Sequence, residues 1–319
     1  MAAPTLVFVH GRGQEYKKPE QLFRKWLAAL NAGLTNAGAD PLPADRAVLP
    51  FYGNVLYDVT ARSAGKTLRL ERMDAGRPET EPPESRRTAD EPGPFDPLTP
   101  PDVGAVEREV LLDMARAVGM AVPDPDAPPP PLERAPGSIR EEGLRDRILS
   151  WRATREVLVT LAKRSRVDQL VIAAQLRDVA IYLSSGRTEI LDLVRRAIPD
   201  DGPLVLVSHS LGTVVARDLL HDAGIRKRTT LWVTAGSPLG LEAVQRNLLD
   251  RGRQHPHVDW VSAFDVNDVV ALGHPLQPSW GSPLKDVEVE NDTDPHSISR
   301  YLAHAGVAGP IGDAASGHD

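Results

Sequence analysis

The chain has 319 residues, of which 41% are hydrophobic and 25% are charged, a composition typical of a globular protein with its own core. The net charge of −7 argues against nucleic-acid binding, because such surfaces carry an excess of Lys and Arg. The absence of cysteine excludes disulfide bonds, a thiolate nucleophile and cysteine-based zinc sites. No apolar run approaches the roughly 20 residues of a membrane span, and the first residues lack a signal-peptide pattern. We therefore expect a cytoplasmic protein without a transmembrane segment.

The first 52 residues predict a strand, a helix and a second strand. Residues 5–9 form a short apolar run typical of a buried parallel strand, and it ends in the small, polar stretch 10–14. Pro19 opens an amphipathic helix that Gly38 can end. Residues 46–51 can form the second strand. This alternation indicates an α/β protein with a parallel sheet.

The pattern then breaks over residues 53–185. Residues 74–136 are rich in Pro and charge and cannot bury enough apolar surface to stay compact alone, so we expect mostly loop or disorder there. Helical periodicity appears at 103–120, 139–161 and 167–183. We interpret 53–185 as an inserted cap. It is either a lid over an active site or a helical insertion that completes the core.

The alternation resumes after residue 186, so residues 1–52 and 186–308 are expected to form one α/β core. The sheet should be mostly parallel, with about six strands flanked by helices. The residues from 309 to 319 are small and polar, and we expect a frayed, flexible tail. The expected elements are helix 188–198, strand 204–207, helix 211–222, strands 230–234, 258–264 and 287–289, and helix 296–305.

Ser210 lies between the apolar strand 204–207 and the amphipathic helix that begins at Leu211. Small residues stand two positions away on each side, Ser208 and Gly212, as a sharp strand-to-helix turn requires. Such a turn exposes the hydroxyl at a helix N-terminus, where negative charge is favoured. The stretch resembles the nucleophile elbow of the α/β-hydrolase superfamily, especially its lipase-like members, with Ser208 in place of the first Gly of G-x-S-x-G.

The resemblance implies an α/β-hydrolase fold and a triad in the order Ser, acid, His. A serine hydroxyl needs an adjacent base, and the base needs a carboxylate that fixes its tautomer. We expect His296 to be the base, because it follows the last expected strand and precedes an aromatic residue and a Leu. The other candidate bases are His274, His304, His255 and His257.

Two carboxylates compete for the role of the acid, Asp265 and Asp268. Both follow a strand's carboxyl end, where open α/β sheets place ligand chemistry. The step Asp268-Val269-Val270 resembles the Asp-x-Val of lipase-like members, so we favour Asp268. The other aspartate is then expected to be a turn or capping residue.

The resemblance also implies an oxyanion hole made by two backbone N–H groups. One belongs to Leu211, and the other to Arg12 in the loop His10-Gly11-Arg12. The Arg12 side chain borders the substrate or, alternatively, pairs with an acidic residue of the cap. Gly236-Ser237-Pro238 resembles a turn that shapes the crevice in lipases and inositol deacylases. The residues expected to border the substrate are Gly11, Gln14 and His209.

These residues predict a serine hydrolase that cleaves a carboxylic ester, with no cofactor and no metal. The apolar segment 167–183 suggests a lipid-like acyl ester. The alternatives are a thioesterase, amidase or peptidase with the same triad, or a binding or effector module. In that last case the cap would recognise a partner protein; otherwise the expected partner is a small-molecule ester.

Overall fold

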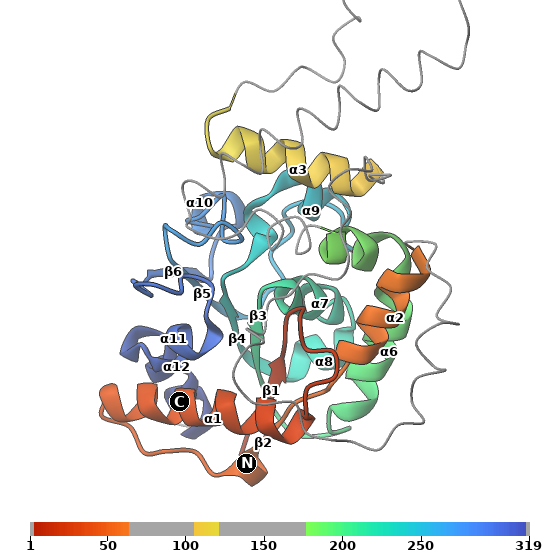
Figure 1. Cartoon of the computed structure of the whole chain (residues 1–319). Helices are drawn as coiled ribbons and strands as arrows, with labels where there is room; N and C mark the ends of the chain where they lie inside the picture. The colour runs from red at the N-terminus through yellow and green to blue at the C-terminus, as the bar shows by residue number, and fades with distance from the viewer. Residues whose placement is uncertain (1–2, 64–104, 121–176, 317–319) are drawn as a thin grey trace, which may run out of the picture.

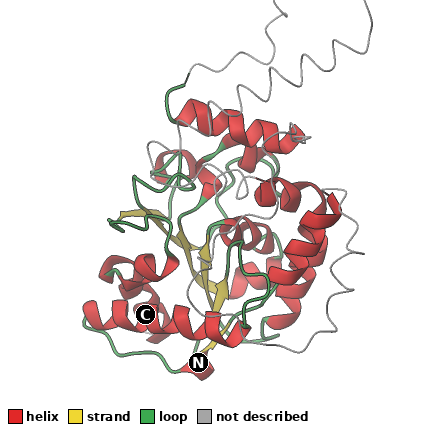
Figure 2. Cartoon of the chain, viewed as in Figure 1, coloured by secondary structure: helices red, strands yellow, loops and turns green. Residues whose placement is uncertain are grey.

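A computed structural model describes residues 3–63, 105–120 and 177–316. It contains a six-stranded, all-parallel sheet with the order β2-β1-β3-β4-β5-β6, flanked by helices on both faces (Figures 1 and 2). The expected α/β arrangement with a mostly parallel sheet is therefore confirmed. The strands are β1 (Thr5–Val9), β2 (Ala47–Val48), β3 (Leu204–His209), β4 (Thr229–Ala235), β5 (Asp259–Phe264) and β6 (Leu284–Glu288).

Both faces of the sheet are buried, which explains why its strands are apolar runs without polar alternation. In β1, Leu6 and Phe8 belong to the core under one helical layer, and Val7 and Val9 belong to the core under the other. The first layer consists of α1 (Pro19–Asn36), α11 (Ile298–Ala303) and α12 (Ala305–Ser316). The second layer includes α2 (Gly53–Ser63), α6 (Arg187–Ala197) and α7 (Leu211–Leu219).

The described parts of the 53–185 insertion pack into the core of the sheet. Leu56 of α2, Met114 of α3 (Ala105–Ala117) and Val179 are buried in the same cluster as Val7 of β1. Residues 177–181 are helical and continue into a π-helical turn, η3 (Tyr182–Gly186). These parts complete the core, as the second interpretation of the insertion expects. The expected helix 139–161, most of 167–183 and most of the Pro-rich stretch 74–136 lie outside the described residues.

Several boundaries differ from expectation because tertiary contacts extend or shorten the elements. The tail expected from residue 309 is instead the second half of α12, which buries Ile311 and Ala315 against α1 and the sheet. The strand expected at 46–51 is only two residues long. The short remaining helices are η1 (Ala44–Arg46), α8 (Ala223–Arg228), η4 (Pro238–Gly240), α9 (Glu242–Arg246) and α10 (Gln277–Trp280). None of the described helices has the length and apolar character needed to cross a membrane.

The strand order creates a switch point between β1 and β3. The chain leaves β1 through α1 to reach β2 on one side, whereas it leaves β3 through α7 and α8 to reach β4 on the other side. Loops diverge at the carboxyl ends of two such neighbouring strands, and open α/β sheets bind ligands in the resulting crevice. His10 follows β1 and Ser210 follows β3, so both of these sequence motifs lie at this position.

Candidate active site

Ser210 occupies a strained turn between β3 and α7. Its φ of 54° and ψ of −130° fall in a region that L-residues other than Gly rarely adopt. The turn is held because the Ser210 N–H donates to the Ala235 carbonyl at 3.1 Å. The Ser210 carbonyl accepts from the Thr213 hydroxyl at 2.7 Å. The neighbouring structure therefore fixes a conformation that the residue alone disfavours.

Small residues around Ser210 allow the backbone segments to approach closely. A Cβ on Gly212 would lie 2.2 Å from the Val9 carbonyl oxygen, so α7 could not begin this close to β1 with any larger residue. A Cβ on Gly11 would lie 2.9 Å from the Ser210 Cβ, so the loop after β1 touches the serine. Ser208, which replaces the first Gly of the elbow pattern, is fully buried; its hydroxyl donates to the Val233 carbonyl at 2.9 Å.

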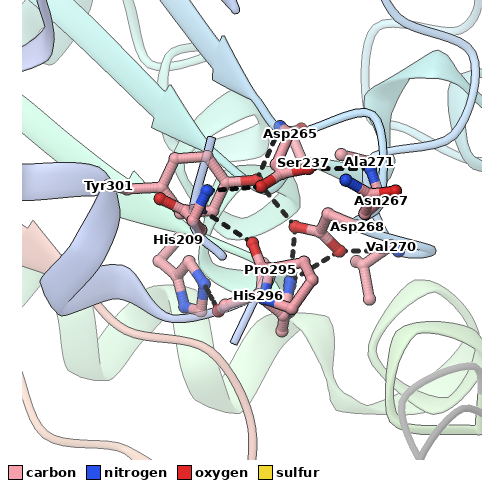
Figure 3. A network of polar contacts seen from close by, with 12 residues as sticks. His209, Ser237, Asp265, Asn267, Asp268, Val270, Ala271, Pro295, His296 and Tyr301 are labelled. Carbon is pink, nitrogen blue, oxygen red and sulfur yellow. Dashed lines mark hydrogen bonds and ion pairs between the residues drawn. The ribbon is translucent and has the colours of Figure 1, made fainter. Parts of the chain in front are cut away.

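His296 and Asp268 form a buried pair, shown in Figure 3. The His296 Nδ1 lies 2.8 Å from one carboxylate oxygen of Asp268 and 3.0 Å from the other. Burial alone would raise the pKa of Asp268. The neighbouring His296, the Tyr301 hydroxyl and the Val270 N–H outweigh it, so the pKa lies below its usual value. Asp268 is therefore a carboxylate at neutral pH, and it fixes the tautomer with the proton on Nδ1.

The other ring nitrogen of His296 is buried and has no hydrogen-bond partner among the described residues. Few buried polar atoms in folded proteins lack a hydrogen-bond partner. A catalytic role is one of the explanations for an atom that does. The imidazole lies near the serine turn: a Cβ on Gly236, the residue after Ala235, would lie 3.0 Å from the His296 Nδ1. No hydrogen bond joins Ser210 and His296 in the described chain. This contact often forms only when substrate is bound.

Asp265 does not pair with His296 and instead organises two loops. Its carboxylate accepts from the Asn267 N–H at 2.7 Å and from the Asn291 N–H at 2.6 Å. The Asn291 side chain in turn donates to the Pro295 carbonyl at 2.9 Å. Asp265 thus has the turn-capping role expected for the aspartate that does not serve as the acid. It also supports the segment that precedes His296.

His209 contacts His296. Burial and the neighbouring His296 lower the pKa of His209 to about 3, so its ring is neutral at pH 7. Its Nε2–H donates to the His296 carbonyl at 2.9 Å, and the two ring centroids are 4.6 Å apart. The expected role of His209 in bordering the substrate remains a prediction. The contacts that the structure does give it support the His296 backbone.

The loop after β1 is ordered by His10. Burial lowers the pKa of His10 to about 4, so the ring is neutral. Its Nδ1–H donates to the Gly11 carbonyl at 2.7 Å, and its Nε2 accepts from the Tyr52 N–H at 3.1 Å. Tyr52 also stacks on the ring and donates its hydroxyl to the His10 carbonyl. His10 therefore holds the loop through Gly11 and ties it to Tyr52.

The Arg12 side chain pairs with an acidic residue of the insertion, which is the alternative expected from sequence. Its Nε lies 2.6 Å from the Asp178 carboxylate, which also accepts from the Thr60 hydroxyl at 3.3 Å. Burial, opposed by Arg12, raises the pKa of Asp178. Gln14 donates its side-chain amide to the Arg12 carbonyl at 2.7 Å. These contacts tie the loop to two segments of the insertion.

Two backbone N–H groups of the site are available as donors. Within the described residues, neither the Arg12 N–H nor the Leu211 N–H has a hydrogen-bond acceptor. Leu211 follows the serine at the start of α7, and Arg12 follows Gly11, which touches Ser210. A pair of preorganised N–H groups on two segments beside a hydroxyl is the arrangement that stabilises a tetrahedral oxyanion.

Three of the four other histidines considered as bases have polar contacts with groups other than a carboxylate, and the backbone N–H of the fourth, His257, donates to the His255 ring. His274 contacts the Ser262 hydroxyl, His304 contacts the Asn291 side chain, and His255 contacts the Pro283 carbonyl. None of these three rings has a carboxylate partner among the described residues. No three His, Asp or Glu side chains in the described ranges gather in a way that could hold a metal ion.

Sequence patterns gave no role to Asn291 or Asp178 and used Tyr301 only as the aromatic residue after His296, although all three contact site residues. Their hydrogen-bond partners lie in other segments, so spacing along the chain carries no signal for these contacts.

Comparisons with protein-family models, curated proteins and solved structures find no match to this chain.

Proposed function

We propose that this chain is a serine hydrolase with an α/β-hydrolase fold that cleaves a carboxylic ester. One observation carries the proposal. A buried imidazole, His296, has its Nδ1 held by the buried Asp268 carboxylate, while its Nε2 has no partner among the described residues. Ser210 occupies a strained turn at a helix N-terminus, and the ring of the residue before it, His209, has its centroid 4.6 Å from that of His296. This combination of a base, an orienting acid and a buried serine hydroxyl at a helix N-terminus suits acyl transfer.

In the first half of the reaction, the Ser210 Oγ attacks the carbonyl carbon of the ester. His296 accepts the hydroxyl proton on Nε2, and Asp268 stabilises the resulting imidazolium. The negative charge on the former carbonyl oxygen is held by the N–H groups of Arg12 and Leu211. The tetrahedral intermediate then collapses, the alcohol leaves with the proton from His296, and an acyl-enzyme remains on Ser210.

In the second half, water replaces the alcohol. His296 takes a proton from the water as it attacks the acyl carbon, and the same two N–H groups stabilise the second tetrahedral intermediate. Collapse returns the proton to the Ser210 Oγ and releases the carboxylic acid. The proposed reaction needs no cofactor, because Ser210, His296 and water account for every proton that moves and every bond that forms.

The described residues do not support a lipid-like acyl ester as the substrate. Val179, Tyr182 and Leu183 belong to the apolar segment that suggested it, and all three are buried in the core instead of lining a surface. We therefore propose an ester without assigning the length of its acyl chain. A panel of p-nitrophenyl esters from acetate to long acyl chains, with thioester and amide analogues, identifies the substrate class.

A fluorophosphonate probe tests the proposal directly. We expect one covalent adduct per chain, located on Ser210 by peptide mass spectrometry, because the probe reacts only with an activated serine. Ser210→Ala should lose the adduct, and its kcat for the best ester should fall by at least roughly 10³-fold. Ser184→Ala, at an exposed serine, is the control and should label normally. A folded wild-type chain without an adduct at Ser210 would overturn the proposal.

A further inference from the structure

Tyr301 lies behind the acid–base pair and contacts both aspartates of the site (Figure 3). Its hydroxyl donates to Asp268 at 2.8 Å and accepts from the Asp265 N–H at 3.0 Å. The direction of these bonds is fixed, because a backbone N–H can only donate and a carboxylate can only accept. The one hydroxyl proton of Tyr301 therefore points at Asp268. The side chain is fully buried, so water does not compete for it.

Asp268 needs such donors because it is fully enclosed. A buried carboxylate without partners becomes protonated, and a protonated acid would no longer favour the proton on Nδ1 of His296. Three groups donate to Asp268: the His296 Nδ1–H, the Tyr301 hydroxyl and the Val270 N–H. Only the Tyr301 hydroxyl comes from α11, the helix that follows the His296 loop. It therefore links the acid to the element that carries the base.

The same hydroxyl joins two chains of contacts. On one side it reaches Asp268 and, through it, the His296 ring. On the other side it fixes the backbone of Asp265, whose carboxylate holds Asn291, and Asn291 holds the Pro295 carbonyl. Pro295 is the residue immediately before His296. The base is thus held by its ring from one side and by its backbone from the other, and Tyr301 connects the two.

We propose that Tyr301 is a positioning residue that keeps Asp268 ionised and aligned with His296. Its catalytic consequence rests on the proposed hydrolase function, but its effect on Asp268 does not. A purely structural tyrosine would contribute packing alone, and phenylalanine would replace it without changing the ionisation of the acid. The two roles therefore differ in a measurable way.

The test is Tyr301→Phe in the full-length chain, followed by carbon-13 NMR of the Asp268 side-chain carboxyl group over a range of pH. The chemical shift of this carbon changes when the carboxylate is protonated. Loss of the hydroxyl donor raises the pKa of Asp268, so we expect the midpoint of this change to move upward by about one pH unit. Tyr182→Phe is the matched control, because its buried hydroxyl donates to a different carboxylate, Asp218. It should leave the midpoint unchanged.

Two further readouts separate the possible failures. If Tyr301→Phe does not fold, 3-fluorotyrosine incorporated into the wild-type chain makes the hydroxyl a stronger donor and should move the midpoint downward. An unmoved midpoint overturns the positioning role. A wild-type chain that does not react with fluorophosphonate, yet shows the shifted midpoint in Tyr301→Phe, instead overturns the proposed hydrolase and leaves the role of Tyr301 intact.

Discussion

At the scale of single residues, the site depends on side chains that can adopt only one state. His10 and His209 are neutral because burial lowers the pKa of each ring, so their donors and acceptors are fixed. Asp268 is ionised because its donors outweigh burial. Gly236 lacks a side chain, and this leaves the space in which Asp268 and His296 meet. A site of this kind is sensitive to single atoms.

Gly236→Ala tests that sensitivity. The new Cβ would lie 2.7 Å from an Asp268 carboxylate oxygen and 3.0 Å from the His296 Nδ1, so the pair must shift. We expect kcat/KM for ester hydrolysis to fall by roughly 10²-fold, because small misplacements of catalytic groups are costly. Steady-state kinetics on the best p-nitrophenyl ester measure it.

The matched control for this substitution is Gly252→Ala. Gly252 also has a positive φ, 89° against 55° at Gly236, but a Cβ there would meet no atom within 4 Å. It should cost about 1 kcal/mol of stability through backbone strain alone and leave kcat/KM unchanged. An equal kcat/KM in the two variants would contradict the claim that a Cβ on Gly236 displaces Asp268 and His296.

At the scale of elements, α11, the helix that follows the His296 loop, packs closely against α1. α1 crosses α11 at Gly33, where a Cβ would lie 2.1 Å from the Leu302 carbonyl oxygen and 2.7 Å from the Ala308 Cβ. Leu302 follows Tyr301 in α11, so this contact also seats the helix that carries the tyrosine. The absence of one side chain in α1 therefore sets how closely α11 and α12 pack against α1.

Gly33→Ala should separate these helices. Alanine normally stabilises a helix interior by up to about 1 kcal/mol relative to glycine. Here we expect a net loss of roughly 1–3 kcal/mol in the free energy of unfolding, because the core is overpacked. Urea unfolding measures it. Gly309→Ala in α12 is the control, since its Cβ would meet Ala37 at an ordinary 3.7 Å. A loss of similar size in both variants would argue against overpacking at Gly33.

At the scale of the whole molecule, burial of the site makes folding depend on pH. Folding lowers the pKa of His10 to about 4 and the pKa of His209 to about 3, from the ordinary histidine value of 6.5. Below pH 6.5 the unfolded chain binds a proton on each ring that the folded chain does not. The stability from these neutral histidines is therefore complete above pH 6.5 and is lost progressively as the pH falls.

We accordingly expect the free energy of unfolding to decrease between pH 7 and pH 5, by about 2 kcal/mol for each of these two histidines. Urea unfolding at both pH values measures the change. His209→Gln removes one titrating ring and keeps an N–H donor for the His296 carbonyl, so its decrease should be smaller by about 2 kcal/mol. A decrease of the same size in His209→Gln and in the wild type would show that His209 does not contribute.

The sequence by itself determined the class of the fold and the order of its elements. Apolar runs of strand length, separated by amphipathic helices, depend only on local periodicity, and they indicate a parallel sheet with helices on both faces. The small residues around Ser210 are likewise a local signal, because the strain of a tight turn is felt by its immediate neighbours. These features could be read without knowing which segments meet.

Only the tertiary structure decided which residues meet. Asp265 and Asp268 are three positions apart in one loop. The path of that loop places Asp268 against the His296 ring and Asp265 against the Asn291 N–H. Arg12 meets Asp178, which is 166 residues away. The polar sequence after residue 309 forms a helix because α1 and the sheet cover its apolar side. Such contacts depend on the free energy of packing distant segments together, and no local pattern encodes that.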